Sequence, residues 1–222
     1  MGATGGQAEV KRCQLALDRA RGGERVALVS SGDAGIYGMA GLVLSMCAAQ
    51  GLKVGPPAGE ADVDLCLEVI PGVPALAAGA ALLGAPLMHD FVAISLSDLL
   101  TPWETIEKRL ELAAPGDIVI VLYNPKSKKR DWQLGAVRDL LLRHKDPGTP
   151  VGIVSRAMRE GQTTTITTLN DLTKNPVDMQ TIVVIGNSQT YTYGDYLITP
   201  RGYQTKYSGQ VSGVRGQERN RD

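Results

Sequence analysis

The sequence predicts an α/β fold with mostly parallel sheets, and three observations support that prediction. Short apolar runs rich in β-branched residues recur along the 222 residues and are typical of strands. Helical patterns lie between most of these runs, and such alternation builds helices around mostly parallel sheets. Some runs, such as IVIVLY at 118–123, are apolar at nearly every position, which favours strands buried on both faces.

The expected elements follow one another from the N-terminus. A helix over 8–21 places Cys13 on an apolar face, and a helix over 132–144 does the same with Val137. An alanine-rich helix follows a proline-glycine turn at 71–72. The expected strands are 26–30, 65–70, 91–96, 118–123, 151–155, 164–168 and 182–185.

The pattern predicts two α/β domains and a tail. The segment GAPL at 84–87 closes the alanine-rich helix and precedes a new series of strands, so we place a boundary near residue 89. An N-terminal α/β domain then covers 1–88, and a C-terminal α/β domain covers 89–207. The last residues, 208–222, are polar and glycine-rich, and we expect them to be disordered.

Composition narrows the classes of partner. Twenty-three basic and 23 acidic residues leave no formal net charge, so no global field attracts nucleic acid or a membrane surface. No run reaches the ~18 apolar residues of a membrane span, and the N-terminus lacks the pattern of a secretory signal. Cys13, Cys47 and Cys66 lack metal-ligand or redox spacing, which favours free thiols in a reducing compartment. We expect a cytoplasmic protein without a metal site.

The segment VALVSSGDAGIYGMAGLVLSM, residues 26–46, is the most informative motif. A strand leads into a glycine-rich turn and then a helix, and α/β folds build ligand sites at such strand ends. Gly32 and Gly35 allow close approach of the backbone to a ligand, Asp33 can accept hydrogen bonds, and Tyr37 adds an aromatic wall. The alternative is a tight turn in which Asp33 only caps the backbone.

Two later segments carry further candidates. The turn over 71–75, PGVPA, separates a strand from the alanine-rich helix. The small residues of that helix could pack around a cofactor, but ordinary core packing explains them equally well. The segment VLYNPKSKKR, 121–130, delivers Tyr123 and Asn124 to a strand end, and the densest basic cluster follows. That cluster suits a polyanionic ligand, although a solvated loop explains it as well.

Taken together, these segments resemble one family. The matching stretches are SSGDAGIYGMA, HDFVAISLSDLLTPWE, VLYNPKSKKR and VDMQTIVVIGNSQTY followed by ITPRGY, in that order between about Thr4 and Tyr207. They are similar to the precorrin-3B, or cobalt-precorrin-3, C17-methyltransferases of corrin synthesis, which are tetrapyrrole methyltransferases. The GDAG form of the first loop is more similar to the branch that acts on cobalt-loaded intermediates.

The resemblance implies a two-domain tetrapyrrole methyltransferase fold with the cofactor cleft between the domains, and a homodimer. It also implies methyl transfer from S-adenosylmethionine to C17 of the tetrapyrrole, with contraction of the ring. Pro74 stands where the family commonly has threonine or serine, so only backbone contact remains there. The implied cofactor contacts are Ser31, Gly32, Asp33, Ile36, Pro74, Ala75, Tyr123 or Asn124, Ala157 and Thr181.

The same resemblance suggests residues for the substrate and for proton transfer. A tetrapyrrole with many carboxylates needs cations that give charge-assisted hydrogen bonds. These would be Lys126, Lys128, Lys129, Arg130 and Arg156, with Arg159 nearby. Ring contraction needs groups that move protons, and the candidates are Tyr37, His89, Ser95, Ser97 and Asp98. For His89 the alternative is a structural histidine at the domain junction.

Members of this family usually begin with a strand and a G-x-G-P-G turn, which have no counterpart in this sequence. We therefore expect the first sheet to lack a strand, which would leave unpaired backbone groups on its neighbour. One rival interpretation is a methyltransferase of the same fold for another tetrapyrrole, ribosomal RNA or a modified histidine. Another is a non-catalytic module that binds corrinoids. Neutral net charge argues against RNA.

Overall fold

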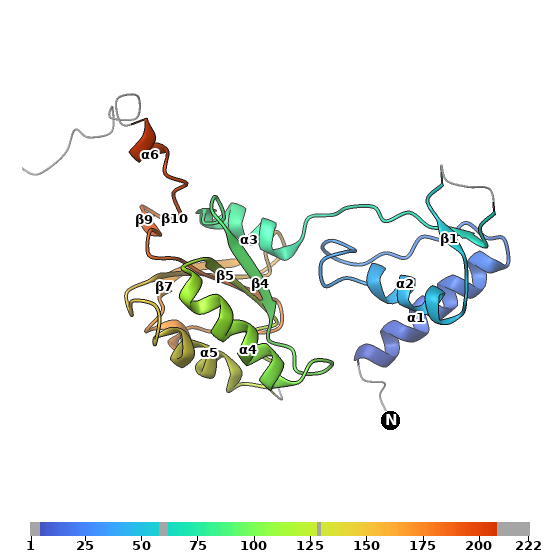
Figure 1. The fold of residues 1–222 in the computed structure, drawn as a ribbon, viewed down its shortest axis with the longest axis horizontal. Helices are drawn as coiled ribbons and strands as arrows, with labels where there is room; N and C mark the ends of the chain where they lie inside the picture. The colour runs from blue at the N-terminus through green and yellow to red at the C-terminus, as the bar shows by residue number, and fades with distance from the viewer. Residues whose placement is uncertain (1–4, 58–61, 128–129, 208–222) are drawn as a thin grey trace, which may run out of the picture. The chain divides into compact units, whose positions relative to one another are not determined.

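A computed structural model describes residues 5–57, 62–127 and 130–207 of the protein. The chain forms two compact units, Met1–Ala75 and Leu76–Asp222 (Figure 1). The alanine-rich helix, except for its first residue, belongs to the second unit, whereas the boundary near residue 89 was placed after it. The domain ranges 1–88 and 89–207 stay a prediction, and the tail 208–222 lies outside the described residues.

The first unit contains two helices that pack on each other, α1 (Gly5–Arg21) and α2 (Ala40–Ala49). Their small core consists of Cys13 and Leu17 from α1 and Cys47 from α2, all buried. The sequence placed Cys13 and Leu17 on one helical face, and their burial confirms that part of the prediction.

The strands of the first unit are shorter than expected. β1 (Val54–Gly55) pairs in parallel with β2 (Leu65–Cys66), so only the start of the predicted strand 65–70 forms. The predicted strand 26–30 is wrong, because the segment has no strand assignment and Val29 is 78% exposed. Strand propensity produces a strand only where a neighbouring strand completes the hydrogen-bonded ladder. In the described part of the chain no strand pairs with 26–30.

A five-stranded sheet forms the centre of the second unit, in the order β4-β5-β8-β6-β7 (Figure 1). Its strands are β4 (Phe91–Ser95), β5 (Val119–Tyr123), β6 (Pro150–Ser155), β7 (Thr163–Thr168) and β8 (Thr181–Ile185). Each corresponds to a predicted strand, with small shifts at the ends. The α/β fold class is thereby confirmed for this unit.

The sheet is mixed, which corrects the expectation of mostly parallel pairing. β4 and β5 are parallel, but β8 lies between β5 and β6 and is antiparallel to both. β6 and β7 also pair antiparallel. The physical reason is connection length: a short turn over 156–162 joins β6 to β7, and parallel crossovers need about a dozen residues or more. Consequently β4, β5 and β6 point one way, and β7 and β8 point the other way.

Both faces of this sheet are covered, as the apolar runs predicted. On one face, Ile120 and Leu122 of β5 join a core with residues of α4 (Trp103–Ala113) and α5 (Gln133–Leu141). On the other face, Val119 and Val121 of the same strand join Leu83 of α3. Figure 1 shows α4 and α5 together on one side of the sheet.

The remaining elements complete the second unit. α3 (Ala75–Leu83) is followed by β3 (Gly84–Ala85), which pairs with β10 (Tyr196–Ile198), and β10 pairs with β9 (Tyr191–Tyr193). Three short helices are η1 (Ala114–Gly116), η2 (Leu172–Lys174) and α6 (Tyr203–Lys206). Within residues 5–57, 62–127 and 130–207, no helix has the length and apolar character needed to cross a membrane.

Candidate functional site

The glycine-rich loop of the first unit is organised by Asp33. Its Oδ1 accepts hydrogen bonds from the N–H groups of Gly35 at 2.7 Å and Ile36 at 3.1 Å, and its Oδ2 accepts one from Gly72 at 2.9 Å. The pKa of Asp33 lies below its usual value, first because of the Gly72 hydrogen bond and next because of the Gly35 bond. Desolvation acts in the opposite direction, and the Ile36 bond adds to the lowering. The alternative interpretation, in which Asp33 caps the backbone, therefore describes its present contacts. A carboxylate has about four acceptor sites, so roughly one remains for a ligand.

The turns at 31–37 and 71–75 lie against each other, and the contact requires glycine. A Cβ atom on Gly72 would lie 2.1 Å from the carbonyl oxygen of Gly32, closer than any real contact. Gly32 itself has φ of +81°, a conformation in which side chains are strained. The two turns that the sequence singled out are thus brought together in one unit.

The other cofactor candidates of the first unit line these turns. Ser31, Ile36 and Ala75 are exposed, and Pro74 is half-buried. Tyr37 is 55% exposed and has φ of +52°, which is uncommon for a residue with a large side chain. The loop therefore presents mainly backbone groups, one carboxylate and one aromatic ring to its surroundings.

In the second unit, the candidates gather at the edge where β4, β5 and β6 end. The register pairs Ser95 with Tyr123 and Ser155 with Thr181, so these four residues belong to the same edge of the sheet. Just beyond the strands, three residues have positive φ, namely Asn124 (51°), Arg156 (51°) and Met158 (58°). Such conformations cost of order 1 kcal/mol or more and tend to occur at functional sites.

Tyr123 and Asn124 both make contacts that order this edge. The hydroxyl oxygen of Tyr123 accepts a hydrogen bond from the N–H of Leu76 at 2.9 Å, and thereby caps the first turn of α3. Asn124 Nδ2 donates to Ser95 Oγ at 2.9 Å, and Ser95 Oγ also accepts from the N–H of Ser97 at 3.2 Å. The side chain of Asn124 therefore fixes the turn that follows β4.

Thr181 is 4% exposed, and its hydroxyl is already engaged. It donates to Asp178 Oδ1 at 2.8 Å, accepts from the Asp178 N–H at 3.0 Å and lies 2.7 Å from Ser155 Oγ. Its N–H also donates to the Asp178 carbonyl oxygen at 3.3 Å, so neither the hydroxyl nor the N–H of Thr181 is left for a cofactor, and a backbone contact would use its carbonyl oxygen. Ala157 is half-buried against the core below the edge, so its small side chain leaves room beside the strand end.

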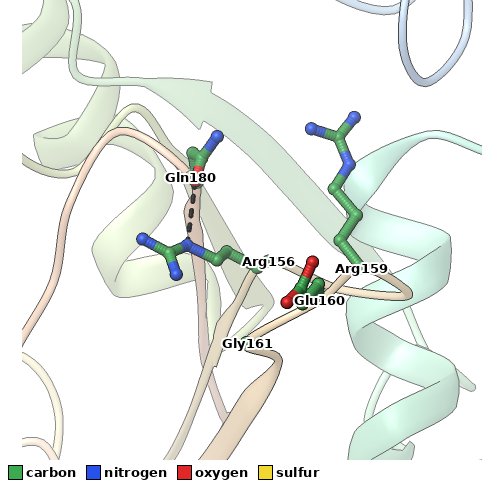
Figure 2. Close-up of a pocket in the computed structure, with 5 residues that line it drawn as sticks. All are labelled: Arg156, Arg159, Glu160, Gly161 and Gln180. Carbon is green, nitrogen blue, oxygen red and sulfur yellow. Dashed lines mark hydrogen bonds between the residues drawn. The ribbon is translucent and has the colours of Figure 1, made fainter.

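A cavity of about 400 Å³ opens at the same edge, beside the end of β6 (Figure 2). Arg156 Nε donates to Gln180 Oε1 at 3.0 Å, and this bond holds the arginine side chain in place. Figure 2 shows the guanidinium of Arg159 extending separately from that of Arg156, with Glu160 between their chains. A Cβ atom on Gly161 would lie 2.8 Å from Arg156 Nη1, so the position leaves little room for a side chain. The cavity presents two guanidinium groups and one carboxylate.

Arg130 was predicted as a substrate cation, but the structure buries it. The residue is 7% exposed, Nη1 donates to the carbonyl oxygen of Leu96, and Nη2 lies 3.3 Å from Met179 Sδ. Its Nε lies 3.7 Å from Asp98 Oδ1. A guanidinium with these partners is not an open cation, which corrects its assignment to substrate binding.

Lys126 remains exposed, at a separate cavity of about 310 Å³. That cavity lies beside the start of α5 and is also lined by Trp132, Arg138 and Asn175. Lys128 and Lys129 lie outside the described residues. Of the predicted basic cluster, Lys126 is thus the described cation that meets solvent.

His89 lies at the opposite edge of the sheet from Ser97 and Asp98, because it precedes β4 whereas they follow it. A five-residue strand spans about 16 Å, so these proton-transfer candidates do not form one group. His89 instead lies near Asp117. Burial acts to raise the pKa of Asp117, but hydrogen bonds from the Ser188 hydroxyl and N–H, together with Lys145 and His89, outweigh it, and the pKa is lowered.

Each unit, taken by itself, gathers candidates of its own at a set of turns, and in the first unit these include the Asp33 carboxylate. The contacts of Gln180, Met179 and Gln133 were not foreseen, because each depends on a partner from a distant segment.

Among the described residues, no group of three or more His, Cys, Asp or Glu could hold a metal ion.

Comparison with known proteins agrees with the fold described above. Residues 2–173 match the family model of tetrapyrrole (corrin/porphyrin) methylases. A cobalt-factor III methyltransferase of Priestia megaterium is 50% identical over 92% of this chain, which spans 37% of that protein. A probable cobalt-factor III C(17)-methyltransferase of Salmonella typhimurium is 50% identical over 90% of this chain, which spans 78% of that protein.

Solved structures extend the comparison. The methyltransferase CobJ has a TM-score of 0.77 and 37% identity, over 86% of this chain and 77% of CobJ. A uroporphyrin-III C-methyltransferase from Thermus thermophilus, in complex with S-adenosylhomocysteine, has a TM-score of 0.56 at 23% identity, which shows the shared fold. The match covers 78% of this chain and 71% of the Thermus thermophilus protein. Because the family model matches residues 2–173 of the 222, the chain belongs to the tetrapyrrole methylases.

Proposed function

We propose that this chain methylates C17 of a cobalt-factor III-type tetrapyrrole in cobalamin biosynthesis, with S-adenosylmethionine as methyl donor and with contraction of the ring. Its relatives carry the names of that reaction. One structural observation supports the proposal most strongly. Segments 95–98, 121–127, 155–157 and 177–181, three of which carry the resemblance, meet at one edge of one sheet.

S-adenosylmethionine supplies a methyl group already activated by the positive charge of its sulfur. The protein must therefore align the donor with the attacking carbon and exclude water, rather than activate a nucleophile. In this proposal, the turns at 31–37 and 72–75 bind it from the first unit. Tyr123 or Asn124, Ala157 and the backbone of Thr181 bind it from the second unit.

Arg156 and Arg159 are the proposed contacts for carboxylates of the substrate. Gln180 orients Arg156 through Nε, which leaves the two Nη groups available for a bidentate contact with a carboxylate. Lys126 is a further cation, at the start of the segment that follows β5. Ser97, Asp98 and Tyr37 remain the proposed groups for proton transfer, and His89 is excluded from that set by its position.

The proposal extends to the assembly and its compartment. We infer a homodimer, as the resemblance implies, and a cytoplasmic location. Cys13, Cys47 and Cys66 are all free thiols, which suits a reducing compartment. Light scattering at micromolar concentration tests the dimer, and a monomeric mass would contradict it.

Incubation of the purified chain with cobalt-factor III and methyl-labelled S-adenosylmethionine, without oxygen, tests the activity. We expect label in the tetrapyrrole and an absorption change that reports ring contraction. Binding of S-adenosylhomocysteine is measured in parallel by calorimetry. Binding of the tetrapyrrole without label transfer would support a non-catalytic corrinoid-binding module instead.

Paired substitutions test the carboxylate contacts. Arg156→Gln combined with Arg159→Gln should raise the substrate KM by roughly three- to tenfold, because two solvent-exposed charge contacts of about 0.5 kcal/mol each are lost. Arg143→Gln is the control, since Arg143 is exposed, does not line this cavity and lies 3.8 Å from Glu111. An unchanged KM in the double variant would contradict this assignment.

A further inference from the structure

Arg130 links its own segment, between β5 and α5, to two other segments at the functional edge of the sheet. It follows β5, it contacts the carbonyl oxygen of Leu96 after β4, and it reaches Met179 before β8. The N–H groups of Arg130 and Ser127 each donate to the other residue's carbonyl oxygen, at 3.2 and 2.8 Å, so the backbone of Arg130 is held by that of Ser127 as well. α5 begins three residues later, at Gln133.

The guanidinium of Arg130 faces the protein interior rather than solvent. Its side chain is 8% exposed, whereas that of its ionic partner Asp98 is 39% exposed. A guanidinium stays protonated inside a protein, so a buried one needs partners to offset its desolvation. Here the partners are the Leu96 carbonyl and the Asp98 carboxylate, which both belong to the loop after β4.

A second buried side chain acts on the same carboxylate. Gln133 is 2% exposed, and its Nε2 donates to Asp98 Oδ2 at 3.1 Å. Asp98 therefore has Arg130 beside Oδ1 and Gln133 beside Oδ2, which sets the orientation of the whole carboxylate. The Oε1 atom of Gln133 is buried without a hydrogen-bond partner among the described residues, so this residue is held in place at some cost.

We propose that Arg130 is a positioning residue that acts through Asp98 and Ser97. Its buried guanidinium fixes residues 96–98 from the α5 side, while Asn124 fixes the same loop through Ser95 from the β5 side. The loop then presents the exposed part of Asp98 in a constant orientation. This inference rests on the proposed function, in which Ser97 and Asp98 handle protons during ring contraction.

The kinetic test separates positioning from substrate binding. In Arg130→Lys and Arg130→Met, kcat should fall by about 10- to 100-fold, the scale for a misplaced reacting group, while the substrate KM stays within about twofold. A raised KM with unchanged kcat, or no change in either, would overturn the proposal.

A double-mutant cycle tests whether Arg130 acts through Asp98. Asp98→Asn should lower kcat much less in the Arg130→Met background than in the parent, because the two residues then act as one unit. Gln133→Met removes the hydrogen bond from Gln133 to Asp98 and should also lower kcat. Full additivity of Arg130→Met and Asp98→Asn would contradict the proposed route.

Arg143→Met is the control at the other end of α5. Arg143 follows that helix and also lies near a carboxylate, Glu111 Oε1 at 3.8 Å, but among the described residues it has no contact with residues 96–98. We expect parental kcat and KM in this variant. A loss equal to that of Arg130→Met would show a general effect of removing a structural arginine.

Amide hydrogen exchange supplies a readout that does not require turnover. In the parent, the Leu96 N–H donates to the Tyr123 carbonyl at 2.9 Å and the Ser97 N–H donates to Ser95 Oγ. Both amides should exchange at least about tenfold faster in Arg130→Lys, and at parental rates in Arg143→Met. Parental rates in Arg130→Lys would overturn the inference. Absence of methyl transfer by the parent chain would instead refute the proposed function.

Discussion

Asp33 illustrates how one carboxylate can fix two turns of the backbone. Because its charged form accepts three backbone hydrogen bonds, the pKa of Asp33 is lowered from 3.8, with Gly72 the largest contributor. A depressed carboxyl pKa contributes stability that is fully present above the unfolded value of 3.8 and is lost as the pH falls through the folded value. The first unit should therefore lose stability in acid.

Asp33→Asn should remove this acid-dependent part. The amide has one acceptor oxygen in place of two charged ones, so the variant should be less stable at neutral pH and should change less with pH below about pH 4. Calorimetric melting of parent and variant from neutral pH into acid measures both effects. Asp146→Asn is the control, because Asp146 accepts a hydrogen bond from the Gly148 N–H at 2.6 Å in the other unit. Coincident acid profiles of parent and Asp33→Asn would refute the argument.

Asn124 has a conformation that its side chain partly explains. Its φ of 51° is tolerated better by asparagine and glycine than by alanine. Asn124→Ala and Asn124→Gly both lose the hydrogen bond to Ser95, but only alanine keeps the backbone strain. Asn124→Ala should therefore be about 1 kcal/mol less stable than Asn124→Gly in urea unfolding. Equal stability would show that the strain is relieved elsewhere.

At the scale of elements, two helical glycines have opposite roles. A Cβ atom on Gly79 of α3 would lie 2.5 Å from Ile182 Cγ2 in β8, whereas one on Gly135 of α5 meets nothing within 4 Å. Alanine favours a helix over glycine by about 1 kcal/mol, but overpacking a core costs about 1–3 kcal/mol. The outcome therefore depends on the neighbour.

We expect Gly79→Ala to destabilise the protein and Gly135→Ala to stabilise it by up to about 1 kcal/mol. Chemical unfolding of the two variants beside the parent measures both signs in one experiment, and each variant serves as the control for the other. Stabilisation by both substitutions would mean that α3 does not pack tightly on β8.

Elements with local signals could be predicted from the sequence, and those that depend on distant partners could not. All five strands of the large sheet were foreseen from runs rich in apolar or β-branched residues, although β7 is threonine at every position except Ile166. Helix α4 was missed, although Ile106, Leu110 and Ala113 follow helical spacing and are buried. The strand expected at 26–30 does not form, because a strand needs a pairing partner from another segment and no described strand pairs with 26–30. The position of β8 between β5 and β6 is equally non-local.

The same distinction holds for the site. Tyr123 and Asn124 were expected at a strand end, and the sheet register places them there with Ser95 and Thr181. The burial of Arg130 could not be foreseen, because its partners come from two other parts of the chain, the loop after β4 and the segment before β8. A run of cations in the sequence does not show which of them faces solvent.

At the scale of the whole molecule, the proposal assigns cofactor contacts to both compact units. S-adenosylhomocysteine should therefore slow amide exchange in both, at the turns 31–37 and 71–75 and at the segment 156–162. Ligand binding stabilises the bound conformation by mass action, so protection should increase with ligand concentration up to saturation. Exchange measured by mass spectrometry resolves these segments separately.

The hairpin of β9 and β10 provides the internal control for this experiment. It belongs to the second unit, forms its own small sheet with β3, and contains none of the proposed cofactor contacts. Its exchange should not change with ligand. Protection confined to the first unit would remove Tyr123, Asn124, Ala157 and Thr181 from the cofactor site. Protection confined to the second unit would remove the Asp33 loop in the same way, and uniform protection of every segment, hairpin included, would point to global stabilisation without identifying the contacts.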